Sequence, residues 1–275
     1  MYTQDEFWSI ELNKKILRMY ESLESMDVSE GIKKRLSAPL RTMVGPKYIP
    51  GSSLLIVGQE THGWGGDPRT IGSSFSSVES YHGRYSSNYI LMEGQTDFIM
   101  NRYGSVSART INSPFWKANV KVSGVGSMAD LLSAGVAWGD LLACDLDGKS
   151  PLRKGAMNRN DLVAFLDYSN KAFQGLLRTT QPKVALLFTG PRYDWIVEDW
   201  FNLPKNWKDN DLRSLPECSD PNEPLLQYVK IFRWNGTLFI RTYHPAYLYR
   251  NKKKDYLKIL DILAATLKNL GVTGP

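Results

Sequence analysis

The chain has 275 residues, of which 42% are hydrophobic and 12% aromatic, so it can bury one large core or two small ones. Lys and Arg (34) exceed Asp and Glu (28), which gives a net charge of +6 and permits a polyanionic partner without establishing one. The only cysteines, Cys144 and Cys218, exclude a disulfide framework and a four-cysteine zinc or iron–sulfur site within the chain.

No apolar run in the sequence is long enough to cross a bilayer, so we expect no membrane partner. The first six residues lack the basic and then apolar layout of a secretory signal. Two distant cysteines fit a reducing compartment, so we expect a cytoplasmic protein, or a nuclear one if the host has a nucleus.

The chain begins with Thr3-Gln4-Asp5-Glu6, which has the form of a capping box. Apolar side chains then recur at helical spacing, which predicts an amphipathic helix that packs rather than catalyses; they are Phe7, Ile10, Ile16, Leu17, Tyr20 and Leu23. We interpret residues 1–50 as a helical lead-in and residues 51–275 as one catalytic domain.

Short apolar runs predict strands at residues 54–57, 136–143, 184–188 and 237–240, separated by stretches long enough for crossover helices. The clearest helical patterns cover residues 161–178 and 255–270, whereas residues 202–224, rich in Asn, Asp and Pro, predict an irregular excursion. The order predicts an α/β fold: a three-layer α/β/α sandwich around a mainly parallel four-stranded sheet.

Polar side chains follow two of these strands. The first strand leads into Gly58-Gln59-Glu60-Thr61-His62, and the last leads through Arg241-Thr242-Tyr243 into His244-Pro245-Ala246-Tyr247-Leu248. Because ligands of α/β proteins bind at the carboxyl edge of the parallel sheet, a carboxylate and an imidazole are predicted there. The basic run 250–254 directly follows the second turn and would offer cations to a phosphate-bearing ligand.

These turns resemble the uracil-DNA glycosylase superfamily. In that family one strand ends in a Gly-Gln-Asp type turn that carries the water-positioning carboxylate. A later strand ends in a His-Pro-Ser-Pro-Leu type turn with the catalytic histidine and a leucine that wedges into DNA. Gly58-Gln59-Glu60 resembles the first turn, and the segment from His244 to Leu248 resembles the second with the same spacing. The resemblance implies that fold and a DNA glycosylase activity.

Three weaker similarities lie between these turns. Phe75 falls where the family places the aromatic residue that stacks on the extruded base. The segment Trp138-Gly139-Asp140 resembles the strand whose end supplies a base-reading Asn in uracil-specific members, and residues 184–190 resemble the strand before a phosphate-contacting loop. The resemblance therefore implies that Gln59, His62, Phe75 and Asp140 contact the base.

Hydrolysis of an N-glycosidic bond builds positive charge on the sugar and negative charge on the leaving base. Glu60 would stabilise the sugar and orient or deprotonate the attacking water, and a neutral His244 would donate to the base O2. A pyrimidine anion needs no further acid, so the expected product is an abasic site without strand cleavage. We expect no cofactor and no metal, because His62 and His82 lack a compact third ligand.

A base within a duplex must be extruded before its glycosidic bond can be reached. Leu248 is predicted to wedge into the vacated stack while Phe75 stacks on the flipped ring. The expected partner is DNA, bound by a monomer, with predicted phosphate contacts from Ser73, Ser74, Thr189, Gly190, Arg250 and Lys252.

The position of the base-reading Asn holds Asp140, which reverses the hydrogen-bonding pattern. A carboxyl group accepts from N4 of cytosine and, if burial keeps it protonated, donates to N3. His62 stands where uracil-specific members have a tyrosine that excludes C5 substituents. Because excision of normal cytosine would destroy the genome, the favoured substrate is a 5-modified cytosine, hydroxymethylated or glucosylated, with phage defence as an extension.

Other interpretations of the same residues stay open. The chain could be a uracil-DNA glycosylase of base-excision repair, a catalytically silent DNA-binding protein of the same fold, or a nucleotide-binding protein. Taken alone, Glu60 could be a helix cap or ion-pair partner, His244 a structural histidine, Asp140 a loop cap, and Leu248 or Phe75 a core residue.

Overall fold

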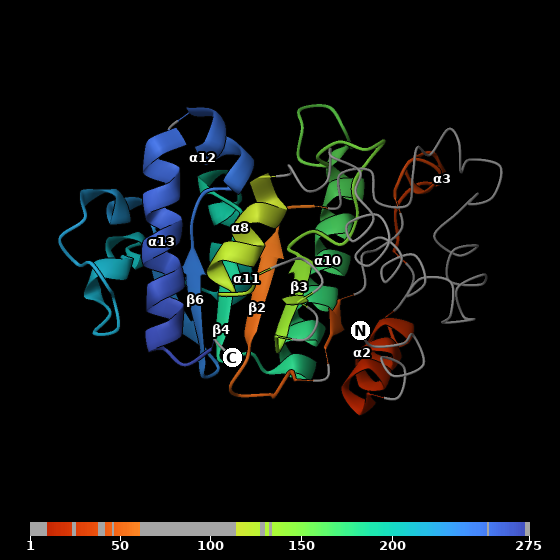
Figure 1. Cartoon of the computed structure of the whole chain (residues 1–275). Coiled ribbons are helices and arrows are strands. Elements are labelled where there is room, and N and C mark those ends of the chain that lie inside the picture. Colours follow the sequence, from red (N-terminus) through yellow and green to blue (C-terminus); the bar gives the residue numbers. More distant parts are fainter. Residues whose placement is uncertain are drawn as a thin grey trace.

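The computed structural model describes residues 10–23, 26–37, 42–45, 47–60, 114–126, 130–131, 134–251 and 253–272. These residues form an α/β fold around one sheet with the strand order β1-β3-β2-β4-β6-β5 (Figure 1). The four central strands are mutually parallel and match the four strands predicted from the sequence; they are β3 (Val136–Asp140), β2 (Leu54–Gly58), β4 (Val184–Leu187) and β6 (Thr237–Arg241).

The prediction of four strands was wrong, because the described sheet also has an antiparallel strand at each edge. β1 (Met43–Val44) pairs with β3, and β5 (Lys230–Trp234) pairs with β6. The turn between β5 and β6 is Asn235-Gly236, with φ of 46° and 83°. Asn-Gly is the preferred pair for a two-residue hairpin, so the sequence carried a signal for β5. β1 has only two residues and left no such signal.

Helices cover both faces of the sheet, so the described residues form three layers (Figure 1). Side chains alternate along each strand: Leu54 and Ile56 of β2 belong to one buried cluster, and Leu55 and Val57 belong to the other. The first cluster includes side chains of α8 (Pro114–Val122), α12 (Pro245–Asn251) and α13 (Lys253–Asn269). The second includes side chains of α2 (Glu11–Glu21), α10 (Arg159–Thr180) and α11 (Asp194–Phe201).

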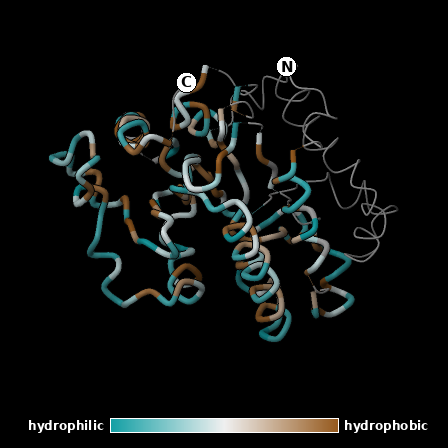
Figure 2. The backbone as a smooth tube through the Cα atoms, turned by 90° about the horizontal axis from the view of Figure 1, so that it is seen from below, coloured by the Kyte–Doolittle hydropathy of each residue, from teal (hydrophilic) through white to brown (hydrophobic). Residues whose placement is uncertain are grey.

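The two long helices agree with the sequence prediction to within a few residues. α10 begins after Asn158, whose side chain accepts a hydrogen bond from the Asp161 amide, and ends at Gln181 in the left-handed conformation. In Figure 2 the colour along the helices alternates between hydrophobic and hydrophilic within each turn, as expected of helices that bury one face. No helix of the described residues is long and apolar enough to cross a membrane.

The N-terminal region contributes to the same core. α2 packs against α10, and the Asn13 amide exchanges two hydrogen bonds of 2.9 Å with the backbone of Val44 in β1. A short helix, α3 (Glu30–Lys33), follows. The predicted capping box at residues 3–6 lies outside the described residues. The irregular excursion contains the short 3-10 turns η3 (Trp207–Asp209) and η4 (Leu212–Ser214), and η5 (Pro224–Tyr228) follows it.

Candidate active site

The carboxyl ends of the four parallel strands meet at one edge of the sheet, the upper edge in Figure 1. Glu60 follows β2, Asp140 ends β3, and His244 follows β6. The loops are tied together by hydrogen bonds. The Gln59 side-chain amide donates to the Thr189 carbonyl at 2.6 Å, and the Gly190 amide donates to the Thr242 carbonyl at 2.9 Å. This edge is therefore a connected frame for the side chains that it carries.

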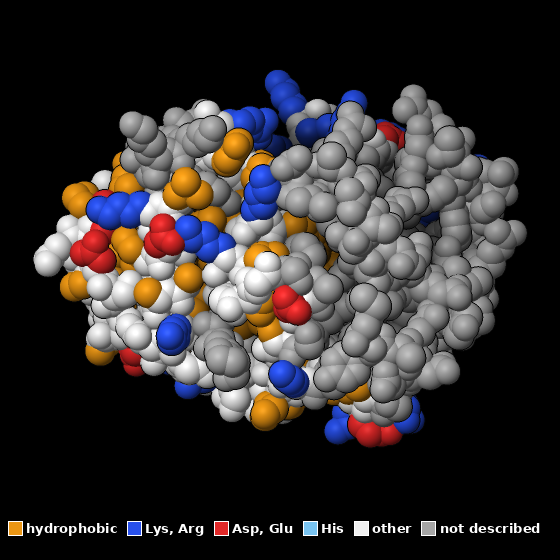
Figure 3. All heavy atoms as spheres, viewed as in Figure 1, with side chains coloured by type: hydrophobic (Ala, Val, Ile, Leu, Met, Phe, Trp, Pro, Cys, Tyr) orange, Lys and Arg blue, Asp and Glu red, His pale blue; other side chains and the backbone are white. Residues whose placement is uncertain are grey.

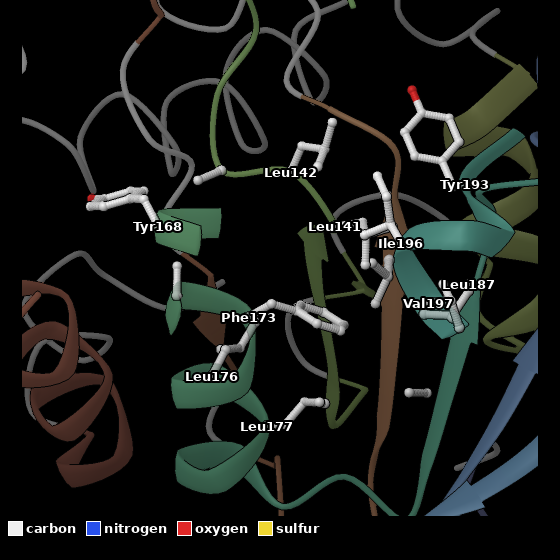
Figure 4. Close-up of a cluster of buried hydrophobic side chains, with 14 of the residues drawn as sticks. Leu141, Leu142, Tyr168, Phe173, Leu176, Leu177, Leu187, Tyr193, Ile196 and Val197 are labelled. Atoms are coloured by element: carbon white, nitrogen blue, oxygen red, sulfur yellow. The ribbon is translucent and has the colours of Figure 1, made fainter. Parts of the chain in front are cut away.

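Glu60 accepts a hydrogen bond from the phenol of Tyr193. Tyr193 ends the short turn η2 (Pro191–Tyr193) and is 1% exposed. Figure 4 shows its ring at the top of a buried apolar cluster, with the hydroxyl pointing away from that cluster. Burial and the negative charge of Glu60 raise the pKa of Tyr193, so the phenol keeps its proton and remains a donor. The hydroxyl of Ser150 lies 3.4 Å from the phenol oxygen.

The hydrogen bonding of His244 defines its tautomer. Its Nδ1 accepts from the backbone amide of Ala246 at 3.2 Å, which requires that Nδ1 carries no hydrogen. The hydrogen of a neutral ring is therefore on Nε2. The ring also stacks on Phe115 of α8, with centroids 5.6 Å apart and planes 6° apart. The imidazole is thus held between a helix N-terminal turn and an aromatic face, with Nε2–H as its donor.

Asp140 lies opposite Gly58 in the parallel register. A Cβ atom at Gly58 would lie 2.2 Å from Oδ1 of Asp140 and 3.5 Å from the Phe115 ring, so only glycine leaves room for this carboxyl group. Burial, followed by the negative charges of Glu60 and Asp145, raises the pKa of Asp140 to about 8. At neutral pH the group is therefore mainly a carboxylic acid, able both to donate and to accept a hydrogen bond.

Phe115 connects two of these side chains, since its ring approaches Gly58 beside Asp140 and stacks on His244. Glu60 instead engages Tyr193, which belongs to the buried cluster on the other face of the sheet. The negative charge of Glu60 contributes to the raised pKa of Asp140. A carboxyl acceptor, a neutral acid and an imidazole donor therefore share one sheet edge.

Several predicted contacts have other positions in the structure. Thr189 is 1% exposed, and the Gly190 amide is used within the frame, so neither offers its polar group to a phosphate in this state. Leu248 is 5% exposed because α12 turns it into the core, so the helix does not present it as a wedge. The side-chain amide of Gln59, predicted to contact the base, instead donates to the Thr189 carbonyl. Arg250 is exposed on α12 and stays a predicted phosphate contact.

Five predicted site residues lie outside the described residues: His62, Ser73, Ser74, Phe75 and Lys252. His82 lies there as well. Their roles stay predictions. Within the described ranges no group of three or more His, Cys, Asp or Glu side chains is placed to hold a metal ion.

Two residues of the site were not predicted from the sequence. Tyr193 follows Gly190-Pro191, and its distance along the chain from Glu60 left no local signal. Phe115 is the second residue of α8, in a segment for which no element was predicted. Only the tertiary fold brings either ring to the sheet edge.

No protein-family model matches the sequence, and no curated protein matches it significantly. The fold and the site define an α/β protein whose polar side chains converge at the carboxyl edge of a parallel sheet, where such proteins bind ligands. The function must therefore be argued from these side chains and their chemistry.

Proposed function

We propose that the chain is a monofunctional DNA glycosylase that flips a base out of DNA, hydrolyses its N-glycosidic bond and leaves an abasic site. The observation that supports this proposal is that one edge of the sheet carries both a hydrogen-bond acceptor and a hydrogen-bond donor. The acceptor is the oriented carboxyl group of Glu60, and the donor is the imidazole of His244. The reaction needs an anion beside the sugar and a donor facing the base. The same residues carry the resemblance to uracil-DNA glycosylases, and we propose that fold type as well.

Glu60 is the group that stabilises the sugar cation and orients the attacking water. The Tyr193 phenol holds one oxygen of the carboxylate and so fixes the orientation of the group that receives the water. A carboxylate that already has a hydrogen-bond donor needs little rearrangement when positive charge develops on C1′. The water adds to C1′, its proton passes to Glu60, and the bond between C1′ and the base nitrogen breaks with its electron pair on the base.

His244 is the group that stabilises the leaving base. Its amide contact from Ala246 leaves Nε2–H as the donor of a neutral imidazole, which suits an oxygen that gains negative charge. One preorganised donor of this kind contributes roughly 3–4 kcal/mol to catalysis, about a hundred- to a thousandfold in rate. The Phe115 ring restrains the plane of the imidazole.

Asp140 is the group that reads the base. Because its pKa is raised to about 8, it is a carboxylic acid at neutral pH that can accept from N4 of cytosine and donate to N3. This pattern favours cytosine over uracil, and a 5-modified cytosine is the substrate that we propose. A role in defence against phages with modified DNA follows from that substrate.

The proposal is tested by incubating the protein with oligonucleotides that carry a single U, T, C, hydroxymethylcytosine or glucosylated hydroxymethylcytosine. Alkali-labile sites report abasic product. We expect cleavage at one or both modified cytosines. Cleavage at U alone would support the uracil-repair alternative and contradict the role of Asp140. Binding without cleavage, unchanged in Glu60→Gln, would instead support a silent DNA-binding protein.

A further inference from the structure

Three tyrosines form a cluster beside His244 at the carboxyl edge of the sheet. The rings of Tyr243 and Tyr247 are stacked, with centroids 5.1 Å apart and planes 14° apart. Tyr228 meets Tyr243 edge-on at 6.1 Å and 70°. We call these three residues the tyrosine platform. Tyr243 directly precedes His244 and Tyr247 follows it by three positions, so the platform lies next to the proposed reaction centre.

The platform is open to solvent but firmly supported. Tyr247 is 49% exposed and Tyr228 is 38% exposed. Behind them Tyr243 is partly buried, and a Cβ atom at Gly190 would lie 3.6 Å from its ring. The Tyr247 ring therefore has one face against Tyr243 and lies on a fixed element, the first turn of α12. A ring held in this way can stack on a planar partner at little entropic cost.

An exposed cation and a basic stretch of sequence follow the platform along the chain. Arg250 is exposed on α12, about one turn beyond Tyr247, and opens the run Arg250-Asn251-Lys252-Lys253-Lys254. Figure 3 shows Lys and Arg side chains along the upper edge of the molecule, mostly to the right of the place where α12 lies in Figure 1. Burial and the neighbouring Tyr247 raise the pKa of Tyr243, so its phenol stays uncharged. Neutral aromatic faces beside cations suit a ligand with flat rings and phosphates.

We propose that the tyrosine platform stacks on unpaired bases of DNA next to the flipped nucleotide, with Tyr247 as the residue that contacts them. The choice of DNA rests on the proposed glycosylase function. Aromatic platforms among cations bind single-stranded DNA because every base has a stacking face, whereas the cations bind the backbone. Tyr247 thereby takes the position at the strand opening for which the sequence suggested Leu248, a residue that is buried in the core.

The test separates stacking from charge. Fluorescence anisotropy measures the affinity of the protein for a labelled dT 12-mer and for a 12-mer of abasic residues with the same number of phosphates. The wild-type protein is expected to bind dT more tightly than the abasic strand. Tyr247→Ala should weaken binding to dT by about 5- to 150-fold while leaving the abasic strand nearly unaffected. Tyr247→Phe should retain the wild-type affinity for dT.

Trp195→Ala is the matched control, because Trp195 is also 49% exposed but lies on α11, which packs on the other face of the sheet. It should leave both affinities unchanged. Equal affinity of the wild-type protein for the two strands, no binding to either, or an equal loss in Trp195→Ala would overturn the proposal. If the protein excises a base but Tyr247→Ala changes neither excision nor DNA binding, the platform proposal is wrong and the glycosylase proposal stands. If the protein binds dT more tightly than the abasic strand but excises no base, the glycosylase proposal is wrong and the platform proposal stands.

Discussion

The phenol of Tyr193 donates a hydrogen bond to the carboxylate of Glu60 across 133 positions of sequence. The donor is anchored in a buried apolar cluster, and the acceptor follows a central strand. Hydrogen bonds to a charged acceptor are stronger than those between neutral groups and fix its orientation. The geometry of the proposed water-activating group is therefore set by a residue from a different element of the fold.

Replacing Tyr193 with Phe removes this donor without changing the shape of the ring. We expect kcat to fall by about tenfold, the rate equivalent of roughly 1.4 kcal/mol, because Glu60 loses a fixed orientation. The acidic limb of the pH–rate profile should move to higher pH, since the lost hydrogen bond favoured the ionised carboxylate. Single-turnover rates between pH 5 and pH 8 measure both effects. An unchanged profile would show that Tyr193 does no more than fill the core.

Asp140→Asn changes the proposed base-reading group from an acid to an amide. The amide donates to O4 and accepts from N3–H of uracil, so we expect the preference to shift from cytosine-type bases to uracil. A matched pair of hydrogen bonds contributes about 1–3 kcal/mol of discrimination, or roughly 5- to 150-fold in the ratio of kcat/KM. Competition between two labelled oligonucleotides gives this ratio directly. A ratio that stays the same would remove Asp140 from base recognition.

The raised pKa of Asp140 also predicts how stability depends on pH. The folded protein holds this proton up to about pH 8, whereas the unfolded chain releases it near pH 4. Stability that is present below pH 4 is therefore lost as the pH rises to about 8. Asp140→Asn lacks this titration, so its melting temperature should exceed that of the wild-type protein more at pH 8 than at pH 5. The same difference at both pH values would contradict the raised pKa.

Gly58→Ala tests the close packing of Asp140. The added methyl group would lie 2.2 Å from Oδ1, so the carboxyl group or the strand must move. We expect a loss of about 1–3 kcal/mol in unfolding free energy and a weaker preference for cytosine-type bases. Gly31→Ala is the control, because a methyl group on Gly31 in α3 would have nothing within 4 Å of it. That variant should be as stable as the wild-type protein or slightly more stable.

The sequence predicted the central sheet well because its parallel strands are continuous apolar runs that end at turns. Leu54–Val57 and Val184–Leu187 are fully buried, as their composition indicates. The edge strands were harder to predict. β5 alternates less clearly, and its best signal was the Asn235-Gly236 turn rather than its own residues.

The site was predicted only in part. Strand ends gave Glu60 and His244, because polar residues directly after buried apolar runs lie at the ligand-binding edge of a parallel sheet. Asp140 came only from the family resemblance. Local patterns do not contain the partners of these residues. Tyr193 and Phe115 reach the edge through the packing of distant segments. The family resemblance gave Leu248 a DNA-wedging role, although α12 turns this side chain into the core.

We propose that Glu60 and His244 together cleave an N-glycosidic bond. The most direct test is the single-turnover excision rate on the preferred oligonucleotide for the wild-type protein, Glu60→Gln and His244→Gln, each verified as folded by its thermal transition. We predict that each substitution lowers the rate by about a hundredfold or more while DNA binding persists. Excision rates within a few-fold of wild type in either variant, or no excision by the wild-type protein from any base tested, would contradict the claim.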